Sequence, residues 1–323
     1  MKKQAYSIAW GILILLLSLV VLNEEVEANQ PPVYTLQQEL HAETLSGEMR
    51  SDGDDRAKAH YLSGIALLAE PGKTMEAIKE FELAVSLERQ NAEYHYKLAE
   101  AYKLEFPSAG MLRKPFIALE VKEHLEEAVQ YDANSVPYRE ALLEYYLLAP
   151  SLLGGGFDKA HVQAQQIYRL DSYMGLLAIG KVMAEKGNFK LSEDCFRKAI
   201  KVKPGAGEAY RRLGEFLFSK KRIDDAIAVL EKCLMLTPDD SEGYRLLGDA
   251  YVAKGKVDVA VAHYGRALKA DPSTASHLFR KAQMYEFRGS FTEAVQYYQI
   301  YLVLIADGPD KVNAQKRVSE LMN

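Results

Sequence analysis

The sequence predicts an all-α protein, a solenoid of helix hairpins, and three observations carry this prediction. Residues 173–308 repeat with a period of 34 residues. Small residues recur at two positions of each repeat, and prolines recur at a third. The first small-residue column is Gly180, Gly214, Gly248 and Ala282, the second is Ser192, Ala226, Ala260 and Ala294, and the proline column is Pro204, Pro238 and Pro272, with Ala306 in the fourth repeat.

Each repeat holds two apolar runs with helical spacing, for example over residues 213–217 and then 226–233. The small residues allow two helix backbones to approach closely. A glycine such as Gly187 or Gly255 ends the first helix, and the proline ends the second. Because one hairpin cannot bury its apolar face alone, the repeats are expected to stack on one another.

The order of residues in these repeats, with Leu213-Gly214, a later tyrosine, and then Ala226, Phe196 and Pro238 in their columns, resembles the tetratricopeptide repeat (TPR) family. The resemblance implies a right-handed α-solenoid of about seven TPR hairpins with a C-terminal capping helix. It also implies a concave groove, lined by the first helix of every hairpin, in which a segment of another protein binds. The chain is thus expected to be a bacterial exported TPR protein.

The whole chain divides into a leader at 1–28, a linker at 29–56, seven repeats and a cap. The linker begins with two prolines and ends in an acidic cluster, and we expect it to be a solvated tether. The cap at 309–323 carries a polar face, as the end of a repeat array in water requires. The repeats are predicted at 57–91, 92–135, 136–172, 173–206, 207–240, 241–274 and 275–308.

The leader has the features of an export signal. Two lysines precede an apolar run from Ile8 to Leu22, and acidic residues follow it. Small or apolar residues at 26–28 predict signal-peptidase cleavage between Ala28 and Asn29. The alternative is a signal anchor that stays in the membrane. In both cases we expect the repeats in the periplasm or on the outer face of the cytoplasmic membrane.

Two repeats depart from the common pattern. The second is about ten residues longer, and the excess within Lys103–Glu120 predicts either a hairpin loop that folds back or a hook that contacts a partner. Its second helix is expected to resume at Val121. The third repeat contains a glycine-rich loop, Gly154–Gly156, without the ending of a phosphate-binding loop. We expect a flexible turn there, with Asp158 capping the next helix.

Composition and side-chain chemistry exclude several classes of function. The net charge of −5 argues against a nucleic-acid-binding protein. Two cysteines, Cys195 and Cys233, are too few for a disulfide framework. We expect Cys233 to be a packed thiol, and a disulfide between the two remains an alternative. His60 and His95 share a column, but tyrosines hold it in later repeats, and two histidines need further ligands to bind a metal. We predict no catalytic, metal or cofactor site.

The predicted partner-binding groove takes its residues from columns of the first helices. Each of two arginines is followed four positions later by an acidic residue: Arg211 by Glu215, and Arg245 by Asp249. Such i,i+4 pairs contribute only about 0.2–0.5 kcal/mol, so we expect the arginines to be available to a partner. The groove residues are Tyr96, Glu100, Glu140, Glu144, Lys181, Arg211, Glu215, Arg245, Asp249, Phe279 and Gln283.

Charge is uneven along the repeats, and this can orient a partner. Residues 57–172 contain 12 basic and 17 acidic side chains, whereas residues 173–306 contain 21 and 16. We therefore expect a non-enzymatic scaffold of the bacterial cell envelope that binds a partner protein segment and aids assembly of an envelope or secretion complex. The alternative is a small-molecule-binding periplasmic subunit of a transport system.

Overall fold

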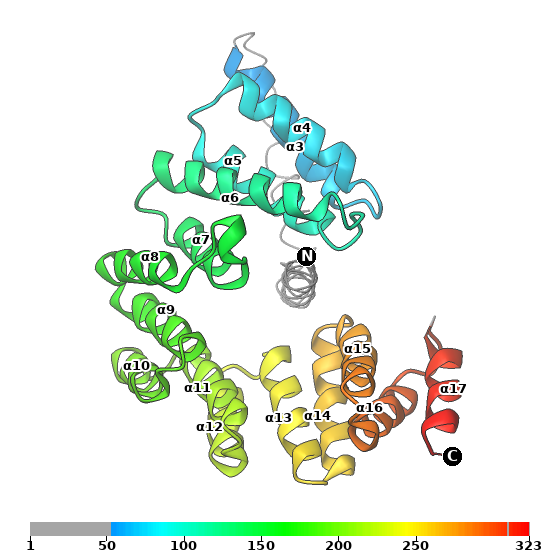
Figure 1. Cartoon of the computed structure of the whole chain (residues 1–323). Helices are drawn as coiled ribbons and strands as arrows, with labels where there is room; N and C mark the ends of the chain where they lie inside the picture. The colour runs from blue at the N-terminus through cyan, green and yellow to red at the C-terminus, as the bar shows by residue number, and fades with distance from the viewer. Residues whose placement is uncertain (1–52, 309, 323) are drawn as a thin grey trace, which may run out of the picture. The chain divides into compact units, whose positions relative to one another are not determined.

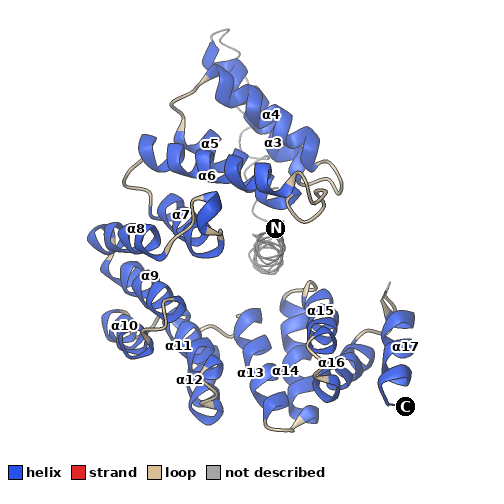
Figure 2. Cartoon of the chain, in the orientation of Figure 1, coloured by secondary structure: helices blue, strands red, loops and turns tan. Residues whose placement is uncertain are grey.

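The computed structural model describes residues 53–308 and 310–322, and within these ranges the chain is helical without strands (Figures 1 and 2). This confirms the predicted all-α fold class. The predicted leader, its cleavage site at Ala28 and Asn29, and most of the linker lie outside the described residues. The helices are α3 (Gly53–Leu68), α4 (Thr74–Leu87), α5 (Ala92–Glu105), α6 (Lys114–Tyr131), α7 (Val136–Leu148), the 3₁₀ helix η1 (Ser151–Leu153), α8 (Phe157–Leu170), α9 (Ser172–Glu185), α10 (Phe189–Val202), α11 (Gly207–Ser219), α12 (Ile223–Leu236), α13 (Ser241–Ala253), α14 (Val257–Ala270), α15 (Thr274–Phe287), α16 (Phe291–Leu304) and α17 (Lys311–Met322).

Local sequence accounts for where these helices begin. Five side chains accept hydrogen bonds from the free N–H groups of a first turn: Asn91 for α5, Ser135 for α7, Asp171 for α9, Asn188 for α10 and Asp240 for α13. Each is a residue type that caps helices well, because its short side chain reaches the N–H groups of the next turn. Within the described ranges, no helix is both long enough and apolar enough to cross a membrane.

The turns that follow the first helices use a left-handed backbone at positions 34 residues apart. Gly187, Gly255 and Gly289 have φ angles of 83°, 70° and 75°. Lys221 occupies the equivalent place in the remaining repeat with a φ of 59°. A side chain in this conformation costs roughly 1–2 kcal/mol, so the turn geometry at Lys221 is imposed by the two helices that it joins.

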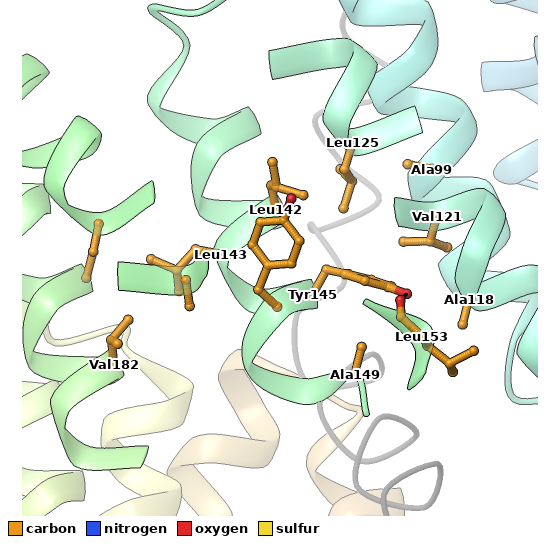
Figure 3. Packing of buried hydrophobic residues seen from close by; sticks show 14 of the residues in the cluster. Ala99, Ala118, Val121, Leu125, Leu142, Leu143, Tyr145, Ala149, Leu153 and Val182 are labelled. Carbon is orange, nitrogen blue, oxygen red and sulfur yellow. Dashed lines mark hydrogen bonds between the residues drawn. The ribbon is translucent and has the colours of Figure 1, made fainter. Parts of the chain in front are cut away.

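The chain forms two compact units, one ending at Gly187 and one beginning at Asn188, here called unit 1 and unit 2. In unit 1, consecutive helices pack as the hairpins α3–α4, α5–α6 and α7–α8, and α9 packs on α8. Figure 3 shows part of the core of this unit. Leu142, Leu143 and Tyr145 of α7 lie in one apolar cluster with Val121 and Leu125 of α6.

In unit 2 the hairpins α11–α12, α13–α14 and α15–α16 follow α10, and α17 packs on α16. The small-residue column lies where the two helices of a hairpin approach. A Cβ placed on Gly214 would lie 2.6 Å from Leu230 Cγ, and one placed on Gly248 would lie 2.6 Å from Tyr264 Cζ. These distances are too short for any side chain, so the large residue of the second helix fills the space that glycine leaves.

The long second repeat differs from its sequence-based prediction. Its second helix begins at Lys114 and not at Val121, because Pro115 fits the first turn of a helix. The excess is therefore a short loop plus two extra helical turns. Phe106 and Ile117 are buried, whereas Met111, Leu112 and Phe116 are largely exposed. One side of the insertion thus packs onto unit 1 and the other faces solvent.

The glycine-rich loop is an ordered turn rather than a flexible one. Leu153 of η1 is buried, and its carbonyl accepts a hydrogen bond of 2.8 Å from the hydroxyl of Tyr145. The N–H of Gly156 donates to the carbonyl of Tyr146 at 2.8 Å. Asp158 makes no capping bond and lies in the first turn of α8, because the cap position is Gly156. The loop therefore serves to pack the α7–α8 hairpin.

Candidate partner-binding surface

Three successive first helices of unit 1 place tyrosines and carboxylates side by side. The rings of Tyr96 on α5 and Tyr138 on α7 lie 4.7 Å apart. Glu100 lies one turn after Tyr96, and Lys97 donates to its carboxylate at 3.0 Å. On the next helices, Lys181 of α9 donates to Glu144 of α7 at 2.9 Å. Tyr96, Tyr138, Glu100, Glu144 and Lys181 are here called the tyrosine row.

The tyrosines of this row are half-buried and acidic side chains surround them. Burial first, and then the carboxylates of Glu100 and Glu144, raises the pKa of the Tyr96 phenol. Burial, followed by the carboxylates of Glu93, Asp132 and Glu100, likewise raises the pKa of Tyr138. Both phenols are therefore neutral at physiological pH. The row presents aromatic faces beside carboxylates, and Lys97 already lies 5.8 Å from the centroid of the Tyr96 ring, which is the kind of contact that a cationic side chain makes here.

Of the predicted groove residues, the row contains Tyr96, Glu100, Glu144 and Lys181. Glu140 lies one turn before Glu144 on α7 and is half-buried. Tyr138 did not come out of the sequence-based columns. The longer second repeat shifts its position in α7 relative to Tyr96 in α5, so alignment by a fixed period misses it. The position of Tyr138 just after the start of α7 at Val136 is the one sequence signal that could have indicated its place beside Tyr96.

The two predicted arginines lie in unit 2, and their partners differ from the expected i,i+4 acids. Arg211 contacts Asp240 at 3.2 Å, the residue that caps the next first helix, α13. Arg245 pairs with Glu242 one turn earlier, and its side chain is 11% exposed. Glu215 lies 3.8 Å from Arg212 instead of pairing with Arg211. The sequence-based pairing was therefore wrong, and both guanidinium groups already have carboxylate partners.

Asp249 is buried instead of lining an open surface. Only 4% of the residue is exposed. Its carboxylate pairs with the Lys281 ammonium and accepts hydrogen bonds from the hydroxyls of Tyr264 and Tyr297, the latter at 2.7 Å. Burial by itself raises the pKa of Asp249, but the attraction of Lys281 and these hydrogen bonds outweighs it, and the pKa lies below its usual value. The contacts of Asp249 are therefore structural contacts within unit 2.

The remaining predicted residues of unit 2 lie near its C-terminal helix. Phe279 is 5% exposed and packs against the rings of Tyr298 and Tyr301. Gln283 is exposed, and together with Phe279 it lines a cavity of about 270 Å³ between α15, α16 and α17. Arg317 of α17 and Glu286 of α15 form an ion pair at this cavity. The arrangement joins the last helix to the hairpin before it.

Both cysteines are buried and carry free thiols. Burial raises the pKa of Cys233 to about 11, and the nearby Asp240 carboxylate acts in the same direction. Burial also raises the pKa of Cys195. A thiol with a raised pKa is a poor nucleophile because it stays protonated. Cys233 is thus the packed thiol that the sequence predicted.

A comparison of the sequence with known families identifies the kind of repeat in the chain. Residues 177–241 and 245–310 each match the family model of the tetratricopeptide repeat. Helix hairpins of the same kind occur in both units: α3–α4, α5–α6 and α7–α8 in unit 1, and α11–α12, α13–α14 and α15–α16 in unit 2. The chain therefore contains tetratricopeptide repeats over residues 177–241 and 245–310. Arrays of this kind offer extended surfaces for binding other proteins or peptides. No curated protein matches the sequence.

Solved structures share the fold at low sequence identity. Human IFIT1, solved as a dimer with PPP-AAAA, matches with a TM-score of 0.52 and 17% identity over 82% of this chain and 63% of that one. Yeast Tom70 matches with a TM-score of 0.52 and 15% identity over 97% of this chain and 74% of that one. The chain spans less than two thirds of the length of IFIT1. At such identities the likeness is one of fold alone.

Proposed function

We propose that the protein is a non-enzymatic interaction scaffold of the bacterial cell envelope. It binds a segment of a partner protein along the first helices of its hairpins and so helps to assemble an envelope or secretion complex. The observation that carries the proposal is the tyrosine row, where two tyrosine rings in contact and carboxylates from successive helices lie together. Aromatic side chains on a rigid scaffold are the usual anchors of a protein interface.

The chemistry of the row favours a basic partner segment. Lysine or arginine side chains can stack on the faces of Tyr96 and Tyr138 while Glu100 and Glu140 compensate their charge. The excess of acidic over basic side chains in residues 57–172, 17 against 12, acts in the same direction. A charged segment would be steered to unit 1 before the contacts form, which raises the association rate more than the affinity.

Reversing charge in the row is expected to weaken partner capture. In the double variant Glu100→Lys with Glu140→Lys, capture of the partner from envelope extract should fall at least tenfold, or about 1.4 kcal/mol. The loss of the Lys97–Glu100 pair costs only about 0.2–0.5 kcal/mol of folding stability. The measurement is affinity capture with the full chain as bait, quantified by mass spectrometry.

The control carries the same change of charge elsewhere. Asp194 and Asp239 are exposed residues of unit 2, and Asp194→Lys with Asp239→Lys changes the net charge by the same amount. This variant should capture the partner as the unaltered chain does. Equal loss in both variants would indicate a general effect of charge and would remove the row from the proposal. Unchanged capture by the row variant would move binding elsewhere, first to the exposed side of the insertion around Leu112.

The envelope location rests on the leader in the sequence. We expect export, with cleavage between Ala28 and Asn29, to release a periplasmic protein that starts at Asn29. Intact-mass measurement of the protein from a periplasmic extract checks this. A species that keeps residues 1–28 and sediments with membranes would mean that the leader is an anchor, and the scaffold would then work at the outer face of the cytoplasmic membrane. Recovery from the cytoplasm alone would contradict the proposed location.

A further inference from the structure

Three metal-ligating side chains converge between α5 and α6 of unit 1. His95 Nδ1 lies 3.0 Å from His124 Nδ1 and 2.8 Å from Glu127 Oε2. His124 Nδ1 lies 3.4 Å from the same carboxylate oxygen. His95 comes from the first turns of α5, while His124 and Glu127 lie one turn apart on α6. The sequence suggested His60 as the neighbour of His95, but His60 pairs with Glu80 at 2.8 Å instead.

A hydrogen bond at Nε2 of His95 determines which ring nitrogen carries the proton and therefore how Nδ1 faces the cluster. The Nε2 of His95 lies 2.9 Å from the carbonyl of Arg89, which can only accept, so Nε2 carries a proton. In the neutral imidazole, the lone pair is then on Nδ1 and faces the pair formed by His124 and Glu127. A backbone carbonyl that holds the outer nitrogen in this way is the usual support of a histidine that binds a metal.

The Nδ1 lone pair of His95 and the carboxylate of Glu127 repel each other at 2.8 Å unless a cation lies between them. His124 can donate one Nδ1 proton, which satisfies only one of these two acceptors. Either a second proton or a metal ion must therefore balance the cluster. Only 2% of His95 is exposed, so this balance is struck in a buried site.

The separations suit a small divalent transition metal. With bonds of about 2.0–2.2 Å to nitrogen and oxygen and tetrahedral angles, ligand atoms lie about 3.4 Å apart. The observed distances of 3.0, 2.8 and 3.4 Å need an outward shift of a few tenths of an ångström. Two histidines and one glutamate form a known ligand set for zinc. The exposed part of Glu127 leaves a fourth position for solvent.

Neighbouring side chains hold both rings in place. The ring of Tyr102 stacks on His124 at 6.1 Å with an interplanar angle of 7°, and Tyr131 lies 5.5 Å from His95. The Glu120 carboxylate is 3.8 Å from the outer nitrogen of His124.

We propose that His95, His124 and Glu127 bind one divalent transition-metal ion of the zinc type, which clamps α5 to α6. The ion replaces the protons that the three ligand atoms otherwise share. It also fixes the helix that carries Tyr96 and Glu100. The proposal rests on the cluster geometry and is independent of the proposed scaffold function.

Zinc binding by the full chain, purified without a polyhistidine tag and stripped of metal, tests this proposal. Equilibrium dialysis against ZnCl₂ should give one bound zinc per chain, measured by atomic emission. His124→Ala should bind on the order of 100-fold more weakly. Glu127→Gln keeps the size of the side chain and removes its charge, so a loss there without a change in the circular dichroism spectrum separates ligation from misfolding.

His161→Ala is the matched control, because this histidine is also on a helix of unit 1 but is not part of the cluster, and its ring lies at hydrogen-bond distance, 3.1 Å, from Gln165. It should bind zinc as the unaltered chain does. Zinc should also raise the melting temperature of the unaltered chain, and excess EDTA should reverse the rise. No stoichiometric zinc on the unaltered chain, or equal affinity in Glu127→Gln, overturns the proposal and leaves a proton shared within the cluster.

Discussion

Replacing Lys281 by Met is expected to destabilise unit 2 by about 3–5 kcal/mol, because the substitution leaves the buried Asp249 carboxylate without its cation. Methionine has a similar length, so packing changes little. The hydroxyls of Tyr264 and Tyr297 still donate to Asp249, but neutral donors compensate a buried charge only partly. Urea unfolding followed by circular dichroism gives the free energy of unfolding for this comparison.

The effect of this substitution depends on pH in a definite direction. In the unaltered chain the pKa of Asp249 is lowered, so its contribution to stability is full above the unfolded-state pKa and is lost only as pH falls through the lower folded-state value. In Lys281→Met, burial is opposed mainly by the hydrogen bonds from Tyr264 and Tyr297, and we expect it to raise the pKa of Asp249 above the unfolded-state value. The variant therefore regains stability as pH falls from 7 towards 4, and the difference between the two proteins narrows.

Lys254→Met is the control, because Lys254 pairs with Asp224 at the surface of the same unit. Asp224 is mostly exposed, and a pair of this kind contributes about 0–1 kcal/mol. Equal losses in the two variants, or a difference that does not change with pH, would show that Asp249 is not held as a buried carboxylate.

Replacing Gly248 by Ala is expected to cost about 1–3 kcal/mol. The new Cβ would lie 2.6 Å from Tyr264 Cζ, and the Tyr264 hydroxyl is fixed by its bond to Asp249, so the ring cannot move away freely. Alanine favours a helix over glycine by about 1 kcal/mol, which opposes this cost. The measured loss is therefore a net value, again obtained from urea unfolding.

Gly265→Ala on α14 isolates the packing contribution. A Cβ there would lie 3.5 Å from Leu304 Cδ2, an ordinary contact. The same gain in helix propensity then raises stability by up to about 1 kcal/mol. If Gly248→Ala stabilised the protein as Gly265→Ala does, the close approach of α13 and α14 would be wrong.

The repeating columns predicted the packing of unit 2 well. The close approach at Gly214 and Gly248 follows from the period, since a small residue must meet a large one at the same place in every hairpin. The limits of this reasoning appear where one residue departs from its column. Lys281 stands where Leu213 and Leu247 stand in the preceding repeats. A lysine in an apolar column requires a buried acid nearby, and that departure was the signal that Asp249 is buried.

The period also fails where the chain changes length. His124 and Tyr138 both come after the insertion in the second repeat, so no fixed spacing places either of them opposite His95 or Tyr96. The partner of Arg211, Asp240, comes from the following hairpin rather than from its own helix. Contacts between hairpins depend on how the helices stack, and a column of residues along one helix does not contain that information.

The side chains around Asp249 also affect how the repeats unfold. Asp249, Tyr264, Lys281 and Tyr297 come from α13, α14, α15 and α16, one from each helix of two consecutive hairpins. Hairpins of a repeat protein can open one at a time when their interfaces are weak. Here, separating the two hairpins would break both the ion pair of Asp249 with Lys281 and its hydrogen bond from Tyr297. They should therefore fold and unfold as a single cooperative block, and fraying that begins at α17 should halt there.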